Sequence, residues 1–315
     1  MKKVFASIAC LAAATFISLG LTTPTEAATK FINIGTGGTA GTYYPLGGAM
    51  ADIFNKNVPN CNASAQSTGA SVANVNLLAQ GKVDIAFIQN DIAYYALNGV
   101  EMFKGRKLDG LRGLATIYPE TVQIIANKSS NITSIKDFKG KRIAVGAAGS
   151  GAEANARQVM SAYGISYKDC TVRYLSFAEA ASALKDGNID AAFLTAGYPT
   201  AAVQDVSTTN DIVLIPIDDK VAKILIDKYP FYTKTTIPAN TYNKQTTPVP
   251  AMSVKCMLVV NNTMDDETSY ALTKALYENL DRMKAAHAAA NAISIASAKD
   301  GMSIPMAKGA AKYFK

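Results

Sequence analysis

Two glycine-rich turns hold the residues whose types and spacing best suit the binding of an anion. Residues 35–44 read GTGGTAGTYY, and residues 146–153 read GAAGSGAE. Each turn follows an apolar run and precedes a helical pattern, so its glycines would let the backbone approach a ligand while unpaired N–H groups at the helix start face an anion. The alternative for each turn is that its glycines serve only the turn geometry. We expect ligand contacts from seven residues of these turns: Thr39, Gly41, Thr42, Tyr43, Ser150, Gly151 and Ala152.

Nucleotide-binding motifs are the obvious rivals for these two turns. The first turn fits the dinucleotide fingerprint loosely, but the next expected strand, residues 62–67, ends without the acidic residue that would hold a ribose. The second turn has the outer glycines of a P-loop, but Ala152 and Glu153 stand where that motif needs Lys and Ser or Thr. The two turns therefore favour capture of a small solute over nucleotide hydrolysis.

Further polar residues stand where expected strands end, as in residues 89–91 (QND) and 195–198 (TAGY). In open α/β sheets, ligands bind beyond the carboxyl ends of the strands. The alternative for Asn90 or Asp91, and for Ser71, is a helix N-cap. We expect ligand contacts from six residues in such positions: Thr68, Ser71, Asn90, Thr195, Gly197 and Tyr198.

An acidic residue, Glu120, stands inside an extended run over residues 114–127 that is longer than an ordinary strand. We expect this run to cross between two lobes, which places Tyr118 and Glu120 at a hinge that faces the ligand. There the Glu120 carboxylate would be the counter-charge of a ligand ammonium group. The alternative for Glu120 is a solvated surface residue.

The chain offers little for catalysis. Its one histidine, His287, lies in an alanine-rich helical pattern without an acidic neighbour, so we expect a surface or packing residue. Zinc sites and hydrolase relays usually need histidines that partner residues position. Cysteines that follow residue 27 lie in or beside apolar runs, which favours free thiols and leaves one disulfide as an alternative: Cys61, Cys170 and Cys256. We therefore expect a binding protein that is not an enzyme, with no cofactor and no metal.

An internal echo divides the chain into two halves. Residues 81–88, GKVDIAFI, recur 106 residues later as residues 187–194, GNIDAAFL. Strands alternate with helical patterns in both halves, which is typical of a mostly parallel sheet covered on both faces. We expect an α/β protein with two lobes around a central ligand cleft. Residues 28–117 and 252–315 would form lobe I, and residues 118–251 would form lobe II with a return connection.

Several individual elements can be predicted in the second half. The pattern indicates a short helix over residues 134–140 and a strand over residues 252–260. A single long helix is expected over residues 265–289. The proline-rich residues 229–250 resist regular structure and suit the return connection.

The N-terminus has the pattern of a signal peptide that is cleaved after about Ala27. Lys2 and Lys3 precede an uncharged apolar run, and small residues stand before the cleavage site. A retained membrane anchor is the alternative. Without residues 1–27 the net charge of +7 becomes +6, and the basic residues are scattered, so we expect no nucleic-acid partner. The expectation is an exported, periplasmic monomer.

Six segments form an ordered set of motifs over nearly the whole chain after residue 27: residues 34–48, 67–74, 81–87, 118–120, 138–146 and 149–151. Together they resemble the TAXI family, the solute-binding proteins of tripartite ATP-independent periplasmic (TRAP) transporters. The resemblance implies a type II periplasmic-binding-protein fold with two hinge strands, and TRAP membrane permease subunits as partners. It also implies glutamate, glutamine or a related carboxylate as the ligand. Residues 305–310, PMAKGA, depart from the family's PLHPGA segment, which bears on transporter docking more than on ligand binding.

Two other functions stay open. One is an ABC-type solute-binding protein on the same fold, which neighbouring genes would reveal through an ATPase in place of a fused TRAP permease. The other is an exported enzyme that acts on a small carboxylate, which would turn its ligand over. The sequence also leaves open whether the ligand is glutamate, glutamine, 2-oxoglutarate or a C4 dicarboxylate.

Overall fold

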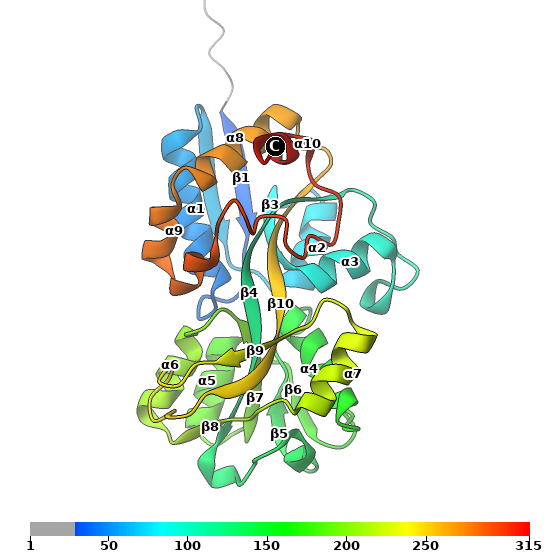
Figure 1. Ribbon diagram of the computed structural model, residues 1–315, viewed down its shortest axis with the longest axis vertical. Coiled ribbons are helices and arrows are strands. Elements are labelled where there is room, and N and C mark those ends of the chain that lie inside the picture. Colours follow the sequence, from blue (N-terminus) through cyan, green and yellow to red (C-terminus); the bar gives the residue numbers. More distant parts are fainter. Residues whose placement is uncertain (1–28) are drawn as a thin grey trace, which may run out of the picture.

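Two α/β lobes joined by two long strands make up the protein in the computed structural model, which describes residues 29–315 (Figure 1). The predicted signal peptide, residues 1–27, lies outside the described residues. Within the described part of the chain, no helix is long and apolar enough to cross a membrane.

Lobe I, the upper half of Figure 1, is built on parallel strands that follow apolar runs of the sequence. These strands are β1 (Lys30–Gly35), β2 (Cys61–Gln66) and β3 (Ile85–Gln89). Its helices are α1 (Tyr43–Asn57), α2 (Ser71–Ala79), α3 (Asn90–Asn98), the 3-10 helix η1 (Glu101–Phe103), α8 (Asp266–Tyr277), α9 (Leu280–Ala286), the 3-10 helix η4 (Ala288–Ala292) and α10 (Lys308–Tyr313). Apolar side chains pack in two separate clusters, one with Phe54 and Phe87 and the other with Ile88 and Ile92.

Lobe II repeats the alternation of strands and helices. Its strands are β5 (Arg142–Ala144), β6 (Thr171–Arg173), β7 (Ala191–Ala196), β8 (Ile212–Leu214) and β9 (Thr233–Ile237). Its helices are the 3-10 helices η2 (Lys128–Ser130) and η3 (Ile135–Phe138), α4 (Gly151–Ala162), α5 (Phe177–Lys185), α6 (Ala201–Thr209) and α7 (Asp219–Lys228). As in lobe I, the central strands β5 and β7 run parallel.

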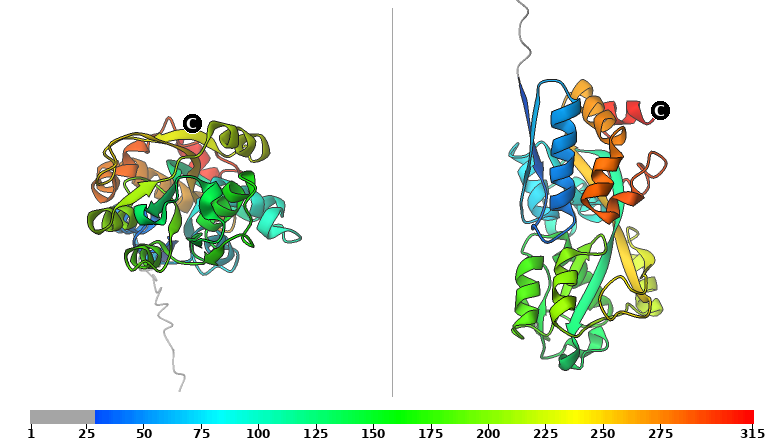
Figure 2. Two further views of the ribbon diagram at one scale, coloured as in Figure 1. Left: turned by 90° about the horizontal axis from the view of Figure 1, so that it is seen from below. Right: turned by 90° about the vertical axis from the view of Figure 1, so that its left-hand side faces the viewer.

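Two strands, β4 (Leu111–Asn127) and β10 (Val249–Asn261), run through both lobes, as Figures 1 and 2 show. They pair antiparallel with each other, β10 also pairs with β3 in lobe I, and β4 also pairs with β7 in lobe II. The result is one sheet in the order β2-β1-β3-β10-β4-β7-β5-β6, with β8 beside β4 and β9 beside β10. The division between the lobes that we expect at residues 117 and 251 falls inside these strands and remains a proposed boundary.

The crossing strand β4 explains the long extended run in the sequence. With 17 residues at about 3.3 Å each, it spans about 55 Å and serves both lobes. Pro119 is exposed within it and lies opposite Lys255, next to a register shift between Cys256 and Met257. A proline is tolerated there because an exposed, irregular part of the ladder needs no N–H from it.

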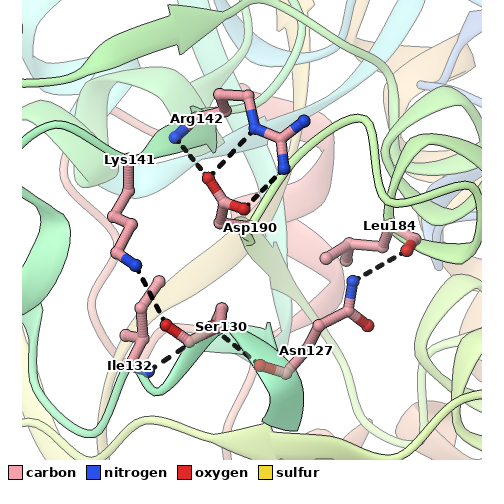
Figure 3. Close-up of polar contacts among 7 residues, drawn as sticks. All are labelled: Asn127, Ser130, Ile132, Lys141, Arg142, Leu184 and Asp190. Carbon is pink, nitrogen blue, oxygen red and sulfur yellow. Dashed lines mark hydrogen bonds and ion pairs between the residues drawn. The ribbon is translucent and has the colours of Figure 1, made fainter.

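The two similar segments, residues 81–88 and 187–194, have the same structural role in the two lobes. In lobe I, the Asp84 carboxylate accepts a hydrogen bond from the Asn33 N–H at 2.8 Å. In lobe II, the Asp190 carboxylate accepts one from the Arg142 N–H at 2.8 Å, and the Arg142 guanidinium adds an ion pair at 2.6 Å (Figure 3). Each aspartate therefore ties the first strand of its lobe to the strand that the echoed segment forms.

The glycine at the start of each of these segments ends the preceding helix. Gly81 follows α2 and Gly187 follows α5, with φ of +65° and +70° respectively. Helices commonly end on a residue in this left-handed region, where glycine carries no Cβ penalty. The two halves thus share a helix stop, a turn and an aspartate anchor.

The predicted helix over residues 265–289 is interrupted. The α8 helix ends at Tyr277, and Asn279 leaves the helical region with φ −131° and ψ 35°. The Asn279 side chain donates to the Ala275 carbonyl at 2.8 Å, a local bond that competes with continuation of the helix. His287 lies between α9 and η4, outside the helix that we expected to contain it, and its Nδ1 accepts from the Ala289 N–H at 3.0 Å.

Two other elements in the structure differ from the sequence-based prediction. The short helix expected over residues 134–140 is the 3-10 helix η3, which begins at a capping box of Ser134 and Asp137. The return connection over residues 229–250 contains β9, whose sequence TKTTI is rich in β-branched residues and pairs with β10.

Candidate ligand-binding site

A cavity of about 80 Å³ lies between the lobes, where β3 and β7 end. Eleven of the fifteen residues that the sequence predicts as ligand contacts line it: Gly41, Thr42, Tyr43, Thr68, Ser71, Tyr118, Glu120, Ser150, Gly151, Ala152 and Thr195. They come from both glycine-rich turns, from the start of α2 and the connection before it, from β4 and from the end of β7. The structure therefore brings both turns and the crossing strand to one cavity, while contact with a ligand stays a prediction.

Asn90 was predicted to contact the ligand but lies outside the lining. Its Nδ2 donates to the Gly301 carbonyl at 3.0 Å, and its Oδ1 accepts from the Lys255 N–H at 3.0 Å. The side chain therefore ties α3 to β10 and to the C-terminal segment. It is also not the N-cap of α3, a position that Gln89 occupies.

The remaining three predicted contacts also lie outside the lining. Thr39 is exposed at the tip of the first turn. The Gly197 carbonyl accepts from Thr42 Oγ1 at 3.2 Å, which makes it a contact between lobes. The Tyr198 hydroxyl is 3.5 Å from the Thr236 carbonyl and so reaches toward β9.

Nine lining residues were missed by the sequence analysis: Gly37, Gly38, Gly69, Ala70, Gln89, Ala147, Ser176, Phe177 and Ala196. Gln89 precedes Asn90 at the end of the echoed strand. Gln89 is the last residue of β3 and its side chain reaches Glu120, whereas Asn90 is the first residue of α3 and its side chain reaches Gly301 and Lys255. The segment pointed to a site, but choosing between the two residues required the orientation of β3. Phe177 carries no polar group that could have marked it.

The start of a helix forms part of the lining at four places: Tyr43 of α1, Ser71 of α2, Gly151 of α4 and Phe177 of α5. The first N–H groups of a helix have no partner within it, and the helix dipole makes this end positive. At three of these starts one N–H already has a partner: Ala73 donates to the Gly149 carbonyl, Glu153 to Ser150 Oγ and Glu179 to Ser176 Oγ. The other first N–H groups of two helices from each lobe are donors beside one volume. A carboxylate is the kind of group that such an arrangement binds.

Glu120 contributes a buried carboxylate to the same cavity. Its side chain is 1% exposed, Oε1 accepts from the Tyr43 hydroxyl at 2.6 Å, and Oε2 accepts from Gln89 Nε2 at 3.2 Å. Burial raises the pKa of Glu120 to about 7, against the lowering effect of these hydrogen bonds. The expectation of a hinge carboxylate that faces the site agrees with this placement, whereas the solvated alternative does not.

No cation accompanies this carboxylate. Among the lining residues, all within residues 29–315, there is no Lys, Arg or His. Glu120 also forms no ion pair with any residue that the structure describes. Buried charges are normally paired. The carboxylate is therefore free to receive a cationic group from a ligand.

Three further polar atoms of the lining are buried and have no hydrogen-bond partner in the described structure: Gln89 Oε1, Tyr118 Oη and Thr195 Oγ1. Buried polar atoms nearly always have partners, so each exception needs an explanation. One amide oxygen and two hydroxyl groups around a cavity are suited to hydrogen bonds with a bound polar molecule.

The lobes touch each other around this cavity. The Ala73 N–H in lobe I donates to the Gly149 carbonyl in lobe II at 3.0 Å. Beside it, Asn155 of α4 donates to the buried Asp91 carboxylate of α3 at 3.1 Å. Together with the bond between Thr42 and Gly197, these contacts describe a closed arrangement of the lobes.

Metal and thiol chemistry have little support in the geometry. Within the described residues, no group of three or more His, Cys, Asp or Glu side chains is placed to hold a metal ion. Cys256 is a buried free thiol, and Cys61 and Cys170 are partly exposed free thiols. Burial of the half-buried His287 lowers its pKa, and it lies outside the cavity lining.

Two α/β lobes, two crossing strands and a cavity between them are the architecture of the type II periplasmic binding proteins. PhnD1 from Prochlorococcus marinus in complex with methylphosphonate aligns with a TM-score of 0.56 at 12% identity, over 84% of this chain and 91% of that chain. The binding protein component of an ABC phosphonate transporter from Pseudomonas aeruginosa gives 0.52 at 16% identity, over 87% and 83%. A putative L-cystine ABC transporter from Listeria monocytogenes gives 0.52 at 16% identity, over 86% and 99%. The predicted fold class is confirmed.

The chain belongs to the NMT1-like family, whose family model matches residues 34–315. The match includes both glycine-rich turns, both crossing strands and the whole cavity lining. The comparisons do not show the TAXI assignment that the sequence motifs suggest, so TAXI membership and a TRAP partner remain predictions.

Proposed function

We propose that this protein is an exported solute receptor that captures a small zwitterion between its lobes and delivers it to a membrane transporter. One observation carries the proposal: a buried carboxylate without a counter-ion, Glu120, faces the same cavity as four helix starts. A ligand with an ammonium group and a carboxylate complements both features. An α-amino acid is the simplest solute of that kind.

The absence of basic residues from the lining narrows the choice of amino acid. A second carboxylate, as in glutamate, would find no Lys or Arg among the described lining residues. Glutamine therefore fits better than glutamate. A cavity must offer roughly 10–15 Å³ to hold one water molecule. The cavity between the lobes, at about 80 Å³, therefore suits a small solute. Ligands without an ammonium group, such as 2-oxoglutarate or a C4 dicarboxylate, would leave Glu120 unpaired.

The transporter partner is inferred from the fold, whereas the ligand class is inferred from the cavity. Solved structures of similar fold include components of ABC transporters, which favours an ABC-type importer over a TRAP permease. Neighbouring genes decide between the two, since the first requires an ATPase and the second a TRAP permease. An exported enzyme is disfavoured because the described lining residues provide no histidine and only one carboxylate. Turnover of a bound ligand would support the enzyme instead.

Mass spectrometry of small molecules that purify with the protein tests the ligand class directly, and an amino acid is the expected result. A thermal-shift panel tests the same ligand class in solution. At 100 times its dissociation constant a ligand stabilises by about 2.7 kcal/mol, which for a chain of this size raises the melting temperature by roughly 5–10 °C.

The panel consists of glutamine, glutamate, succinate, 2-oxoglutarate, phosphate and methylphosphonate. We expect glutamine to give the largest shift and the last four to give none. A shift by methylphosphonate or phosphate alone would indicate an anion receptor and contradict the zwitterion.

A further inference from the structure

Gln89 occupies a position in the cavity that the proposed function does not yet use. Its side chain is 2% exposed and comes from the last residue of β3 in lobe I. Its Nε2 donates to Glu120 Oε2 at 3.2 Å, whereas its Oε1 is buried without a donor. The amide therefore holds the carboxylate with one end and presents an unpaired acceptor with the other.

The orientation of this amide is fixed from three sides. The Gln89 N–H donates to Ser71 Oγ at 3.1 Å, which anchors the backbone at the start of α2. The bond to Glu120 fixes Nε2. On the third side, Gly151 of lobe II leaves so little room that a Cβ at that position would lie 2.0 Å from Oε1 and 2.4 Å from Cδ of Gln89. The amide oxygen thus cannot turn away from the cavity without displacing its neighbours.

We propose that Gln89 Oε1 is the second acceptor for the ligand ammonium group, and that Gln89 makes the receptor selective for primary amines. The inference rests on the proposed function. A primary ammonium has three N–H donors, so it can donate to Glu120 and to Gln89 Oε1 at the same time. An N,N-dimethyl ammonium has a single N–H and must leave one of these acceptors unpaired. An unpaired buried acceptor is costly, which gives the discrimination.

The probes for the test are glycine and L-glutamine, each with its N-methyl and N,N-dimethyl forms, measured by calorimetry. The variant Gln89→Met has similar length but no acceptor. Gln204→Met, at an exposed position on α6, is the matched control. Gln89→Asn keeps the amide but shortens its reach. The melting temperature of each variant without ligand reports whether it is folded.

The wild type and Gln204→Met are expected to bind the primary amine tenfold or more tightly than the N,N-dimethyl form, the ratio that one hydrogen bond to a charged group produces. In Gln89→Met and Gln89→Asn this ratio should fall toward one. Size exclusion alone would leave the ratio unchanged in these variants.

A folded Gln89→Met or Gln89→Asn protein that keeps the wild-type ratio overturns the inference and leaves the zwitterion proposal intact. If the wild type binds none of the six probes, the ligand class is wrong and both proposals fail.

Discussion

Glu120 is the residue on which the ligand assignment depends most. The Glu120→Gln variant keeps the size of the side chain and removes its charge, so a bound ammonium would lose its counter-charge. Breaking a buried charge pair on one side costs about 3–5 kcal/mol, so we expect affinity for glutamine to fall at least a hundredfold. Calorimetry measures this, with Glu278→Gln at an exposed site as the control.

Two experimental results would contradict the proposal that Glu120 binds the ligand ammonium group. Glu120→Gln could retain the affinity of the wild type for glutamine. Alternatively, 2-oxoglutarate, which has no ammonium, could stabilise the wild type as much as glutamine does. Either result would assign the buried carboxylate to another purpose.

The pKa of Glu120 makes binding depend on pH. Because burial raises this pKa to about 7, the ligand-free carboxyl is largely protonated below pH 7. A ligand ammonium favours the ionised form, so binding releases a proton below that pH. Linkage then predicts that affinity rises about tenfold per pH unit well below 7 and levels off above it. Titration calorimetry from pH 5 to 8 measures the slope, which Glu120→Gln should abolish.

The stability of the ligand-free protein should have the opposite pH dependence. Burial also raises the pKa of Asp91 to about 7. For both carboxyl groups the folded pKa exceeds the unfolded one, so the folded state binds more protons between about pH 4 and 7. These two groups therefore lower the free energy of unfolding as pH rises through this window, which outweighs the smaller opposite contribution of His287, whose pKa is lowered by burial. Denaturant unfolding that showed a rise instead would contradict the burial of these groups.

Residue-level prediction from the sequence succeeded where the local pattern defines the position. Glu120 could be placed at the hinge because it stands in the middle of an extended run too long for one lobe. Gln89 could not be preferred over Asn90, because only the tertiary course of β3 and α3 decides which side chain faces the cavity. Thr39 and Tyr198 lie outside the cavity lining, and only the tertiary course of their turns decides this.

At the level of elements, the two glycine-rich turns are not equivalent, although the sequence suggests equal roles. A Cβ at Gly41 would meet its neighbours at 3.4 Å, an ordinary contact, whereas a Cβ at Gly151 would overlap Gln89. Neither residue has a positive φ, so alanine suits both backbones. Gly151→Ala should therefore fold normally and block closure of α4 against β3.

For Gly151→Ala we expect at least a tenfold loss of glutamine affinity with an unchanged or slightly raised melting temperature. Gly41→Ala should change affinity less. Gly48→Ala, where the added Cβ meets open space, controls for the effect of alanine on a helix. Calorimetry and circular dichroism together measure this. Normal binding by folded Gly151→Ala would remove the close approach of Gly151 from the mechanism.

Helices and strands were predicted most completely where turn residues clearly separate alternating strands and helices. The strand–turn–helix units around residues 31–97 are present in the structure with small shifts of their ends. The α6 and α7 helices were not predicted, since both are short, and α6 also follows a segment considered only for its polar residues. β9 was hidden by the prolines that flank it, because its pairing with β10 is a tertiary effect.

For the whole molecule, the contacts between the lobes predict a change of shape on binding. A ligand that bonds to both lobes shifts the equilibrium from an open to the closed arrangement described here. Small-angle scattering should show a smaller radius of gyration when glutamine is added. Gly151→Ala should remain extended at the same ligand concentration. A radius that does not change for the wild type would argue against a hinge at β4 and β10.

The crossing strands also determine how the protein unfolds. The ladder between β4 and β10 extends from the Leu111–Asn261 pair in lobe I to the Thr121–Ser253 pair near lobe II, and its two register shifts change the pairing without ending it. Loss of either lobe would strip partners from strands that the other lobe needs. The two lobes should therefore melt as one cooperative unit, with equal calorimetric and van't Hoff enthalpies. A ligand held by a few side chains at the centre thus stabilises the entire chain.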